Sequence, residues 1–451
     1  MKYAAYDEYK TSNIGWIRDF PAHWELKRLK YVANRAEVKV EADEDNPLPY
    51  IGLEQVEPWT GRLVDLDDDL VPTGISNRFE AGDTLFGKLR PYLAKACNVD
   101  FDGLCSSELL VLRGKTYDRK FLLYQLLSHG FVNLVDSTTY GSKMPRASWD
   151  FIGVCELPLP PLDEQQTIAS FLDAKTAQID ALVAQKRQLI AKLKEKRSAL
   201  IARTVTRGLP PEAAKAAGLE PNPEMKDSGV EWLGKIPEHW QLVSLFRVAQ
   251  SIQTGPFGTQ LHHADYVDDE VPLINPIHLV DGKLQPDSKN TVTPETAERL
   301  SRYKLTSGEI VFARRGDIGR CAVVLPEQEG WLCGTGSMVV RLHAQYCDSH
   351  YYSLVFQSSG FRSLLELNAV GTTMLNLNPS ILGRMLVPVP PLVEQQSIVV
   401  FIGNETAKID SLIQQVESAI ARLTEYRQAL ITSAVTGKID VRDWQAELEA
   451  A

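Results

Sequence analysis

Two stretches of the chain carry side chains that suit contact with a nucleic acid. In the first half, basic residues stand among two tyrosines, and the set is Lys88, Arg90, Tyr92, Lys95, Tyr140, Lys143 and Arg146. In the second half, polar and basic residues recur in "QTGPFGTQ", in "RRGDIGR" and beyond, and the set is Gln253, Thr254, Arg314, Arg315, Arg320, Thr372, Thr373, Asn376 and Asn378.

These residue types match the chemistry of DNA. Arginine and lysine neutralise phosphates, arginine can hold guanine through two hydrogen bonds, and asparagine or glutamine can do the same for adenine. The glycines of "QTGPFGTQ" would let the backbone approach a partner closely. We therefore interpret both sets as candidate DNA contacts. Solvated surface charge stays open as the alternative for any single residue.

Motifs for catalysis are missing from the sequence. It has no GxxxxGK[ST] loop for a nucleoside triphosphate, no glycine-rich turn between a clear strand and helix, and no Asn-Pro-Pro-aromatic segment. The acidic run "VDLDDDL" places Asp65, Asp67, Asp68 and Asp69 together, which suits either a hard metal ion or, as we favour, a solvated acidic turn. His262 and His263 are adjacent and therefore poor joint ligands, so we expect neither a metal site nor a catalytic residue.

Composition sets the class of protein. The chain has 451 residues, 44% hydrophobic and 24% charged, which is enough for two or three globular domains. Its six cysteines form no CxxC pair and are expected to be reduced thiols. No apolar run approaches the roughly 20 residues of a membrane helix, and the N-terminus has no signal core, so we expect a soluble cytoplasmic protein.

The net charge argues against one class of nucleic-acid binder. At -10, with a pI near 5.4, the chain is acidic, whereas a free-standing, non-specific binder is usually basic. Strong binding to a polyanion would therefore need partner subunits.

An internal repeat runs through the whole chain. "LPLPPLDEQQTIASF" from Leu157 matches "VPVPPLVEQQSIVVF" from Val387 at nine of 15 positions. "IRDFPAHWELKRLKYVA" from Ile17 matches "LGKIPEHWQLVSLFRVA" from Leu233, and "YGSKMPRASW" from Tyr140 matches "VGTTMLNLNP" from Val370. The order is kept while the offset grows from 216 to 230, so the second copy carries loop insertions.

Each copy has the same predicted plan. A Pro-x-His-Trp segment precedes mixed sequence in which "GDTLFGKL" and "GEIVFARRGD" read as strands, and a proline-rich hinge then leads into a long helix. The predicted divisions are a first recognition domain at 1–157, a hinge and helix at 158–208, a linker at 209–235, a second recognition domain at 236–387, a hinge and helix at 388–440, and a tail at 441–451.

The two predicted helices carry narrow apolar stripes at heptad spacing. The stripes consist of Ile168, Leu172, Ile179, Leu182, Leu189, Leu193 and Leu200 in the first helix and Ile398, Ile402, Ile409, Leu412, Ile420, Leu423 and Leu430 in the second. Such stripes are typical of a coiled coil. Because tandem copies can pair like a two-fold dimer, we expect the helices to pair with each other and to run antiparallel. The fold class is α+β, with two mixed α/β domains.

The copies differ where they could read bases. Hinge and helix are nearly duplicated, whereas the globular parts share only landmarks. A duplicated scaffold with two different reading heads would recognise a two-part target with unlike halves. The helices between the heads would set the separation of those halves.

These residues resemble the specificity subunit (HsdS) family of type I restriction–modification enzymes. The resemblance rests on "GSKMPRASW", on the doubled Pro-Pro-Leu-x-Glu-Gln-Gln block with its long helix, and on the ending "YRQALITSAVTGKID", and it covers essentially the whole chain. It departs in the second copy, which has "MLNLNP" where the first has "MPRASW".

The resemblance implies a non-catalytic subunit. Each globular part would be a target recognition domain that reads one half of a bipartite, asymmetric site in double-stranded DNA. The paired helices would dock two methyltransferase subunits, which associate with restriction subunits and flip out an adenine in each half-site. S-adenosylmethionine, ATP and magnesium would belong to those partners, with no cofactor in this chain.

Two alternatives are kept beside this reading. A coiled-coil scaffold that binds only proteins would also have tandem helices, and it would show no DNA affinity even with partners present. A metal nuclease that uses Asp65 to Asp69 would lose cleavage by the isolated chain when that cluster is substituted.

Overall fold

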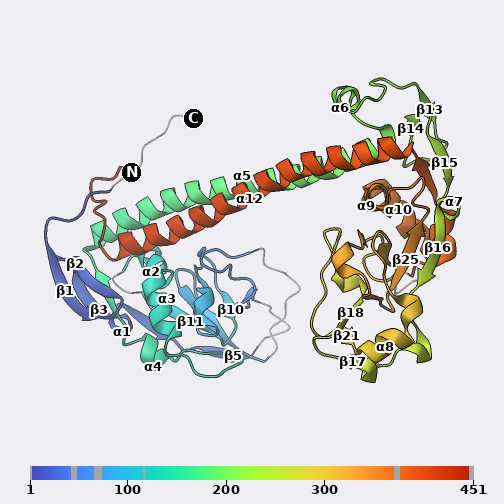
Figure 1. Cartoon of the computed structure of the whole chain (residues 1–451). Coiled ribbons are helices and arrows are strands. Elements are labelled where there is room, and N and C mark those ends of the chain that lie inside the picture. The colour runs from blue at the N-terminus through green and yellow to red at the C-terminus, as the bar shows by residue number, and fades with distance from the viewer. Residues whose placement is uncertain (1–2, 42–47, 65–73, 115–116, 370–375, 446–451) are drawn as a thin grey trace. The chain divides into compact units, whose positions relative to one another are not determined.

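The chain folds into two compact units, shown in the computed structural model of Figure 1. The structure describes residues 3–41, 48–64, 74–114, 117–369 and 376–445. The first unit comprises Met1–Arg187 and Val416–Ala451, and the second comprises Gln188–Gln415. Each unit therefore contains one globular part together with a portion of both long helices.

The main sheet of the first unit has four antiparallel strands in the order β4-β11-β8-β9. Their bounds are Ala33–Ala36 for β4, Leu109–Gly114 for β11, Thr84–Gly87 for β8 and Ala96–Asn98 for β9. Around the sheet lie α1 (Leu29–Val32), α2 (Arg119–Leu126), α3 (His129–Asp136), α4 (Trp149–Ile152) and the short turn η1 (Pro91–Leu93). Every residue of β8 is buried, which makes the end of this strand a fixed base for the loop that follows.

The main sheet of the second unit repeats this order as β16-β25-β22-β23. Its strands are Ala249–Thr254 (β16), Ser337–Leu342 (β25), Ile310–Ala313 (β22) and Cys321–Val323 (β23). The accompanying helices are α7 (Leu245–Val248), α9 (Ser349–Gln357), α10 (Ser359–Asn368) and α11 (Pro379–Arg384). The framework that carries the candidate contacts is therefore present twice.

The smaller sheets have diverged. In the first unit the order is β5-β7-β10-β6, with bounds Lys39–Glu41, Ile75–Phe79, Gly103–Cys105 and Tyr50–Ile51. In the second unit the order is β17-β21-β18-β24, with bounds Tyr266–Val267, Thr291–Val292, Val271–Ile274 and Leu332–Cys333. Each sheet has one parallel pair, β6 with β10 in the first unit and β18 with β24 in the second. The later strand of the pair, β10, lies inside the first sheet, whereas the earlier strand, β18, lies inside the second.

Paired strands complete both units. The pairs of the first unit are β1 (Tyr9–Ile14) with β2 (Ile17–Pro21) and β3 (Glu25–Arg28) with β12 (Glu156–Leu159). Those of the second are β13 (Met225–Asp227) with β14 (Lys235–Pro237), β15 (Gln241–Ser244) with β26 (Leu386–Val389), and β19 (Leu279–Val280) with β20 (Lys283–Leu284). The second unit also contains α6 (Pro211–Ala216) and α8 (Pro294–Arg299).

The long helices are α5 (Leu162–Arg207) and α12 (Leu392–Val435). Each helix begins directly after a Pro-Pro pair, which suits the start of a helix. A glycine with positive φ lies just beyond the end of each helix, Gly208 after α5 and Gly437 after α12. Among the helices that the structure describes, none combines the length and apolarity that a membrane span requires.

The two helices pack against each other in antiparallel fashion (Figure 1). In the first unit, Ile168 and Leu172 near the start of α5 share a core with Ile431 and Val435 near the end of α12. In the second unit, the end of α5 shares a core with the start of α12, through Ile201 and Val205 and through Ile398 and Ile402. The predicted fold class, α+β with two globular regions and paired antiparallel helices, is confirmed.

The positions of the helix stripe differ in part from the predicted set. Ile168, Leu172, Ile179, Ile398, Ile402, Ile409 and Leu430 are buried, and Leu193, Leu200, Ile420 and Leu423 are partly buried. Leu182, Leu189 and Leu412, however, keep 45%, 45% and 47% of their surface exposed. The residues that follow them, Val183, Ile190 and Ile413, are less exposed than these leucines. An α-helix has 3.6 residues per turn, so its inward face drifts relative to a strict seven-residue repeat.

Candidate nucleic-acid interface

In the first unit, the loop after β8 lies beside the segment that precedes α4. The backbone N–H of Arg90 donates to Pro145 O at 2.7 Å, and that of Ala147 donates to Lys88 O at 2.9 Å. Tyr140 and Arg146 exchange two backbone hydrogen bonds of 3.0 Å each, which close the loop that carries Lys143. The backbone therefore brings Lys88, Arg90, Lys143 and Arg146 into one cluster of loops.

Several side chains of this cluster remain available to a ligand. Arg90 and Lys143 are exposed and Lys88 is half-buried, and none of these three side chains has a hydrogen-bond or ion-pair partner among the described residues. Tyr140 is 63% exposed and Tyr92 is 45% exposed. Three cations beside two exposed aromatic rings suit a polyanion whose bases also offer stacking surfaces.

Two of the predicted contacts are engaged within the unit. The Arg146 guanidinium donates from Nε to Glu108 Oε1 at 3.0 Å and forms an ion pair with that carboxylate. The Lys95 ammonium donates to Leu53 O at 2.6 Å, and burial lowers its pKa. In this structure both side chains stabilise the loops rather than present a free charge, and their contact with DNA stays a prediction.

The second unit places its arginines at the equivalent point, directly after β22. Arg315 forms an isolated antiparallel bridge with Asn376, as Leu89 does with Arg146 in the first unit. Arg314 donates from Nε to Asn376 Oδ1 at 3.3 Å, and burial, followed by the nearby charge of Arg315, lowers its pKa. Arg315 is exposed and has no side-chain partner among the described residues, so it is the freest cation of this loop.

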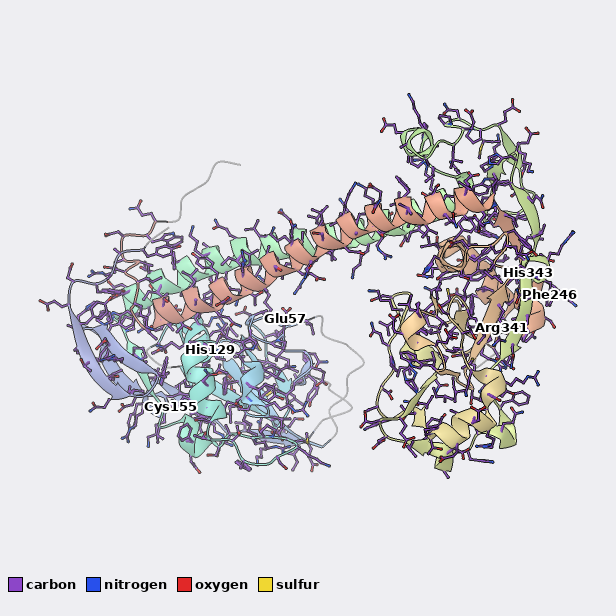
Figure 2. All side chains as sticks on the ribbon, viewed as in Figure 1. Glu57, His129, Cys155, Phe246, Arg341 and His343 are labelled. Atoms are coloured by element: carbon purple, nitrogen blue, oxygen red, sulfur yellow. The ribbon has the colours of Figure 1, made fainter. Side chains whose placement is uncertain are left out.

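The other candidates of the second unit are mostly engaged. The candidate Gln253 accepts at Oε1 from Arg341 Nη1 at 2.9 Å, and Arg341 of β25, labelled in Figure 2, also pairs with Glu309. Arg320 pairs with Asp317 at 3.2 Å, and Thr254 is half-buried in β16.

Three further candidates lie in the segment that leads into α11. Asn378 accepts a hydrogen bond from Ile381 N at 2.9 Å and caps α11. Thr372 and Thr373 lie outside the described residues. As DNA contacts, all of these residues stay predictions.

Polar residues that sequence reasoning did not select fasten each globular part to its helix. Gln165 of α5 accepts from Asp118 N at 3.0 Å, and Asp118 in turn caps α2. Gln395 of α12 accepts from Asp348 N at 2.8 Å, and Asp348 caps α9. These equivalent contacts explain the first glutamine of the repeated Glu-Gln-Gln, and the repetition itself was the signal that could have identified them.

The preceding glutamates bind the Pro-x-His-Trp segments. His23 lies 2.8 Å from Glu164, and His239 lies 2.8 Å from Glu394, measured between Nε2 and Oε2. Both carboxylates are largely buried, so each requires such a partner. The Pro-x-His-Trp and Glu-Gln-Gln motifs thus form the two sides of one junction in each unit.

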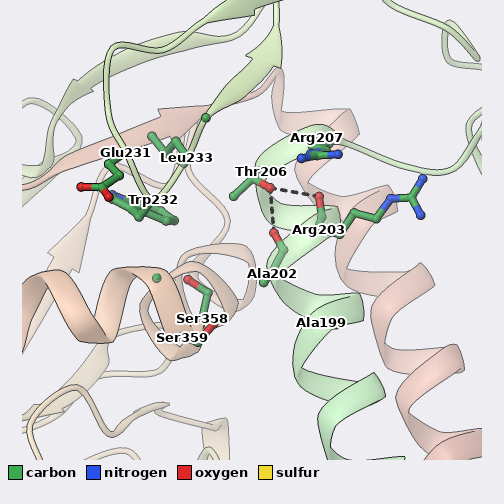
Figure 3. Close-up of a pocket in the computed structure, with 12 residues that line it drawn as sticks. Ala199, Ala202, Arg203, Thr206, Arg207, Glu231, Trp232, Leu233, Ser358 and Ser359 are labelled. Atoms are coloured by element: carbon green, nitrogen blue, oxygen red, sulfur yellow. Dashed lines mark hydrogen bonds between the residues drawn. The ribbon is translucent and has the colours of Figure 1, made fainter.

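A surface pocket of the second unit lies outside the candidate interface (Figure 3). It has a volume of about 470 Å³ and is lined by the end of α5, by residues 231–234 and by the start of α10. At its wall, Thr206 Oγ1 donates to the backbone oxygens of Ala202 and Arg203 at 2.8 and 3.2 Å. None of the candidate DNA contacts lines this pocket.

Metal-ligand geometry is not found in the described part of the chain. No group of three or more His, Cys, Asp or Glu side chains is placed there to hold an ion. The acidic run from Asp65 to Asp69 lies outside the described residues. His262 is exposed, and its backbone N–H donates to Asp265 Oδ2 at 2.8 Å.

Comparisons with known proteins agree with this architecture. The model of the "Type I restriction modification DNA specificity domain" family matches residues 21–192 and again residues 237–422. The chain is 25% identical over 333 residues to the type I restriction enzyme EcoBI specificity subunit of Escherichia coli, covering 73% of this chain and 68% of that protein. It is 22% identical over 461 residues to the MjaVIII specificity subunit of Methanocaldococcus jannaschii, covering 96% and 98%.

A solved structure shares the fold. It is described as the structural basis of complex assembly and conformational transition of the type I restriction–modification system, and it superposes with a TM-score of 0.66 at 18% identity over 93% of this chain and 99% of that one. Two matches of the family model cover most of the sequence. The chain therefore belongs to the family of type I restriction–modification DNA specificity subunits, which are non-catalytic and carry no cofactor of their own.

Proposed function

We propose that the chain recognises a bipartite, asymmetric site in double-stranded DNA and reads one half with each unit. The observation that carries the proposal is a duplicated framework with different free side chains at equivalent loops. Among the described residues, the cations without a side-chain partner are Lys88 and Arg90 after β8, with Lys143 in the facing loop, and Arg315 after β22. Unlike heads on a common framework suit a target with unlike halves.

The reading heads in this proposal keep the divisions predicted from the sequence. The first head lies within residues 1–157 and the second within residues 236–387, while α5 and α12 fix the gap between the two half-sites. Phosphate contacts position each head, and a few side chains per head select bases. The charge of -10 suits a chain that binds DNA tightly only within a larger complex.

The proposed partners are two methyltransferase subunits and, through them, restriction subunits. Each unit contains one end of both antiparallel helices, which offers two equivalent places for one kind of partner. The partners would bind S-adenosylmethionine, ATP and magnesium, and would flip out an adenine in each half-site. This chain contributes recognition and assembly, and none of its residues takes part in methyl transfer.

The methylation pattern of a genome tests this function. The chain is produced together with its methyltransferase in a host without DNA methylation, and the modified positions are mapped across the genome. The expected result is one motif with two unlike halves and a fixed gap. A continuous or palindromic motif would contradict two unlike heads. A confirmed complex without methylation would favour a protein scaffold.

A further inference from the structure

The loop between β8 and β9 holds two residues in an unfavourable backbone conformation. Arg90 has φ 51° and ψ 60°, and Ala94 has φ 46° and ψ 51°, so both lie in the left-handed region. Residues with a Cβ rarely adopt this backbone region, and they are held there only when the surrounding structure enforces it. The two residues enclose Pro91–Leu93, the turn that exposes Tyr92.

The second unit uses glycine at the place of Arg90. Gly87 is the last residue of β8, and Ala313 is the last residue of β22. Two residues further on, Leu89 in the first unit and Arg315 in the second unit form the backbone bridge to the facing loop. Arg90 is therefore equivalent to Gly316, which has φ 72°. Glycine adopts this conformation without a steric penalty, so the framework itself has no need of an arginine here.

Within the described part of the chain, the Arg90 side chain has no partner. Only its backbone is held, by the 2.7 Å hydrogen bond from its N–H to Pro145 O, while its guanidinium is exposed and unpaired among the described residues. Its neighbour Arg146, by contrast, pairs with Glu108. A charged side chain on an enforced backbone, without an internal contact, is placed for an external ligand.

Among the four bases, the chemistry of the guanidinium favours guanine. An arginine on a rigid backbone presents two parallel N–H groups, and this fork matches the O6 and N7 acceptors of guanine in the major groove. The same fork also fits a phosphate, but a phosphate contact tolerates a flexible lysine and does not require a fixed backbone. Lys88 and Lys143, close by, are free to make such contacts.

We propose that Arg90 is the specificity-determining residue of the first unit and reads a guanine in its half-site. This inference rests on the proposed function, and it adds the residue, the base and the unit. Gly316 leaves the second unit without an equivalent reader, so the two half-sites differ at this position. Tyr92, displayed by the same turn, lies beside the bound base pair.

The test compares Arg90→Gly, Arg90→Asn and Arg90→Lys in the complete complex with the methyltransferase. Glycine and asparagine both accept the left-handed region, so they remove the guanidinium without straining the loop. Lysine keeps the charge but loses the fork. Lys143→Ala is the matched control, because it removes a neighbouring free charge. Genomic motifs, melting temperatures and affinities for sites with single base changes are measured for all four variants.

The expected result separates recognition from stability. Arg90→Gly should melt at or above the wild-type temperature while its preference for one G·C pair of one half-site falls about ten- to hundredfold. Arg90→Asn should lose the same preference, and Arg90→Lys should lose the preference but keep more of the affinity. Lys143→Ala should weaken binding to every sequence alike and leave the motif unchanged.

Three results would overturn the inference. The first is a methylation motif that Arg90→Gly and Arg90→Asn leave unchanged. The second is a loss of sequence preference at an A·T pair instead of a G·C pair. The third is a melting temperature of Arg90→Gly below that of the wild type. The wild-type complex in the same experiment keeps this outcome distinct from failure of the proposed function. If the wild type yields a bipartite motif and the variants do not alter it, the function stands and Arg90 is not the reader.

Discussion

Asp180 and Asp410 occupy equivalent positions on α5 and α12, yet their surroundings differ between the units. Asp180 lies 3.1 Å from Arg427 Nε and 2.8 Å from Arg62 Nη2, and Arg427 also donates to Trp59 O at 2.8 Å. In the described part of the second unit, Asp410 pairs with Arg197 alone, also at 3.1 Å.

The two ion pairs have the same length but different exposure. The Arg427 side chain is 7% exposed, whereas the side chains of Arg197 and Asp410 are 39% and 54% exposed. Water screens the second pair, so it contributes little to stability, while the first fastens residues 59–62 of its globular part to the helices. The same Arg–Asp pair at equivalent helix positions therefore differs in its contribution to stability, because only the pair of the first unit is largely buried.

The largest predicted effect on stability comes from removing Arg427, the buried arginine of the first ion pair. Arg427→Ala leaves the carbonyls of Trp59 and Thr60 without this donor and Asp180 with the more exposed Arg62 as its ion-pair partner, so we expect the first unit to lose about 2–4 kcal/mol. Arg197→Ala, the matched control, should lower the stability of the second unit by less than about 1 kcal/mol. Peptide-resolved hydrogen exchange on the full chain measures each unit separately, and equal losses would contradict the role assigned to burial.

The next prediction concerns what the units share. Gln165 and Gln395 are buried, and each both accepts from a backbone N–H and donates to a proline carbonyl, at Pro160 or Pro390. Gln165→Ala and Gln395→Ala should each cost about 1–3 kcal/mol in their own unit, because buried backbone groups lose partners. Chemical denaturation combined with the same exchange measurement checks this, and a loss confined to one unit would show that the junctions are not equivalent.

The smallest predicted effect belongs to the first unit alone. The Tyr6 hydroxyl donates to Glu164 Oε1 at 2.7 Å, and burial, followed by this hydrogen bond, raises the pKa of Tyr6. Tyr6→Phe should cost about 1 kcal/mol, since the carboxylate keeps its contacts with Trp24 and His23. The equivalent residue of the second unit is Asn222, because Lys10 and Lys226 make matching contacts with Trp24 O and Trp240 O.

A control isolates the hydroxyl of Tyr6. Tyr31→Phe removes a hydroxyl from a ring that is 70% exposed, and it should leave the melting temperature unchanged. If both variants behave alike, the contact between Tyr6 and Glu164 does not stabilise the first unit.

Much of the fold followed from local sequence. The Pro-Pro pairs and heptad stripes predicted both long helices, and the repeat predicted their antiparallel pairing, because these features act over neighbouring residues or whole copies. The helix seam was predicted less well at Leu182, Leu189 and Leu412. Leucine spacing alone did not reveal that the inward face had moved by one residue.

The state of each candidate contact did not follow from sequence. Glu108 lies 38 residues from Arg146, and Leu53 lies 42 residues from Lys95, so the partners of both cations appear only when the chain is folded. Proline at position 91 disfavours a right-handed helical conformation of Arg90, but it does not specify the left-handed one that the structure has. Composition identified the cations, and tertiary contacts decided which of them stay free.

Exchange of one head tests the central claim most directly. Residues 25–157 of the first copy replace residues 241–387 of the second, with every junction contact of Glu164, Glu394 and the Pro-x-His-Trp segments retained. Because the two helices run antiparallel, the account predicts methylation at a bipartite motif whose two halves are inverted copies of the first half-site. Methylation of the original motif with two unlike halves would contradict it.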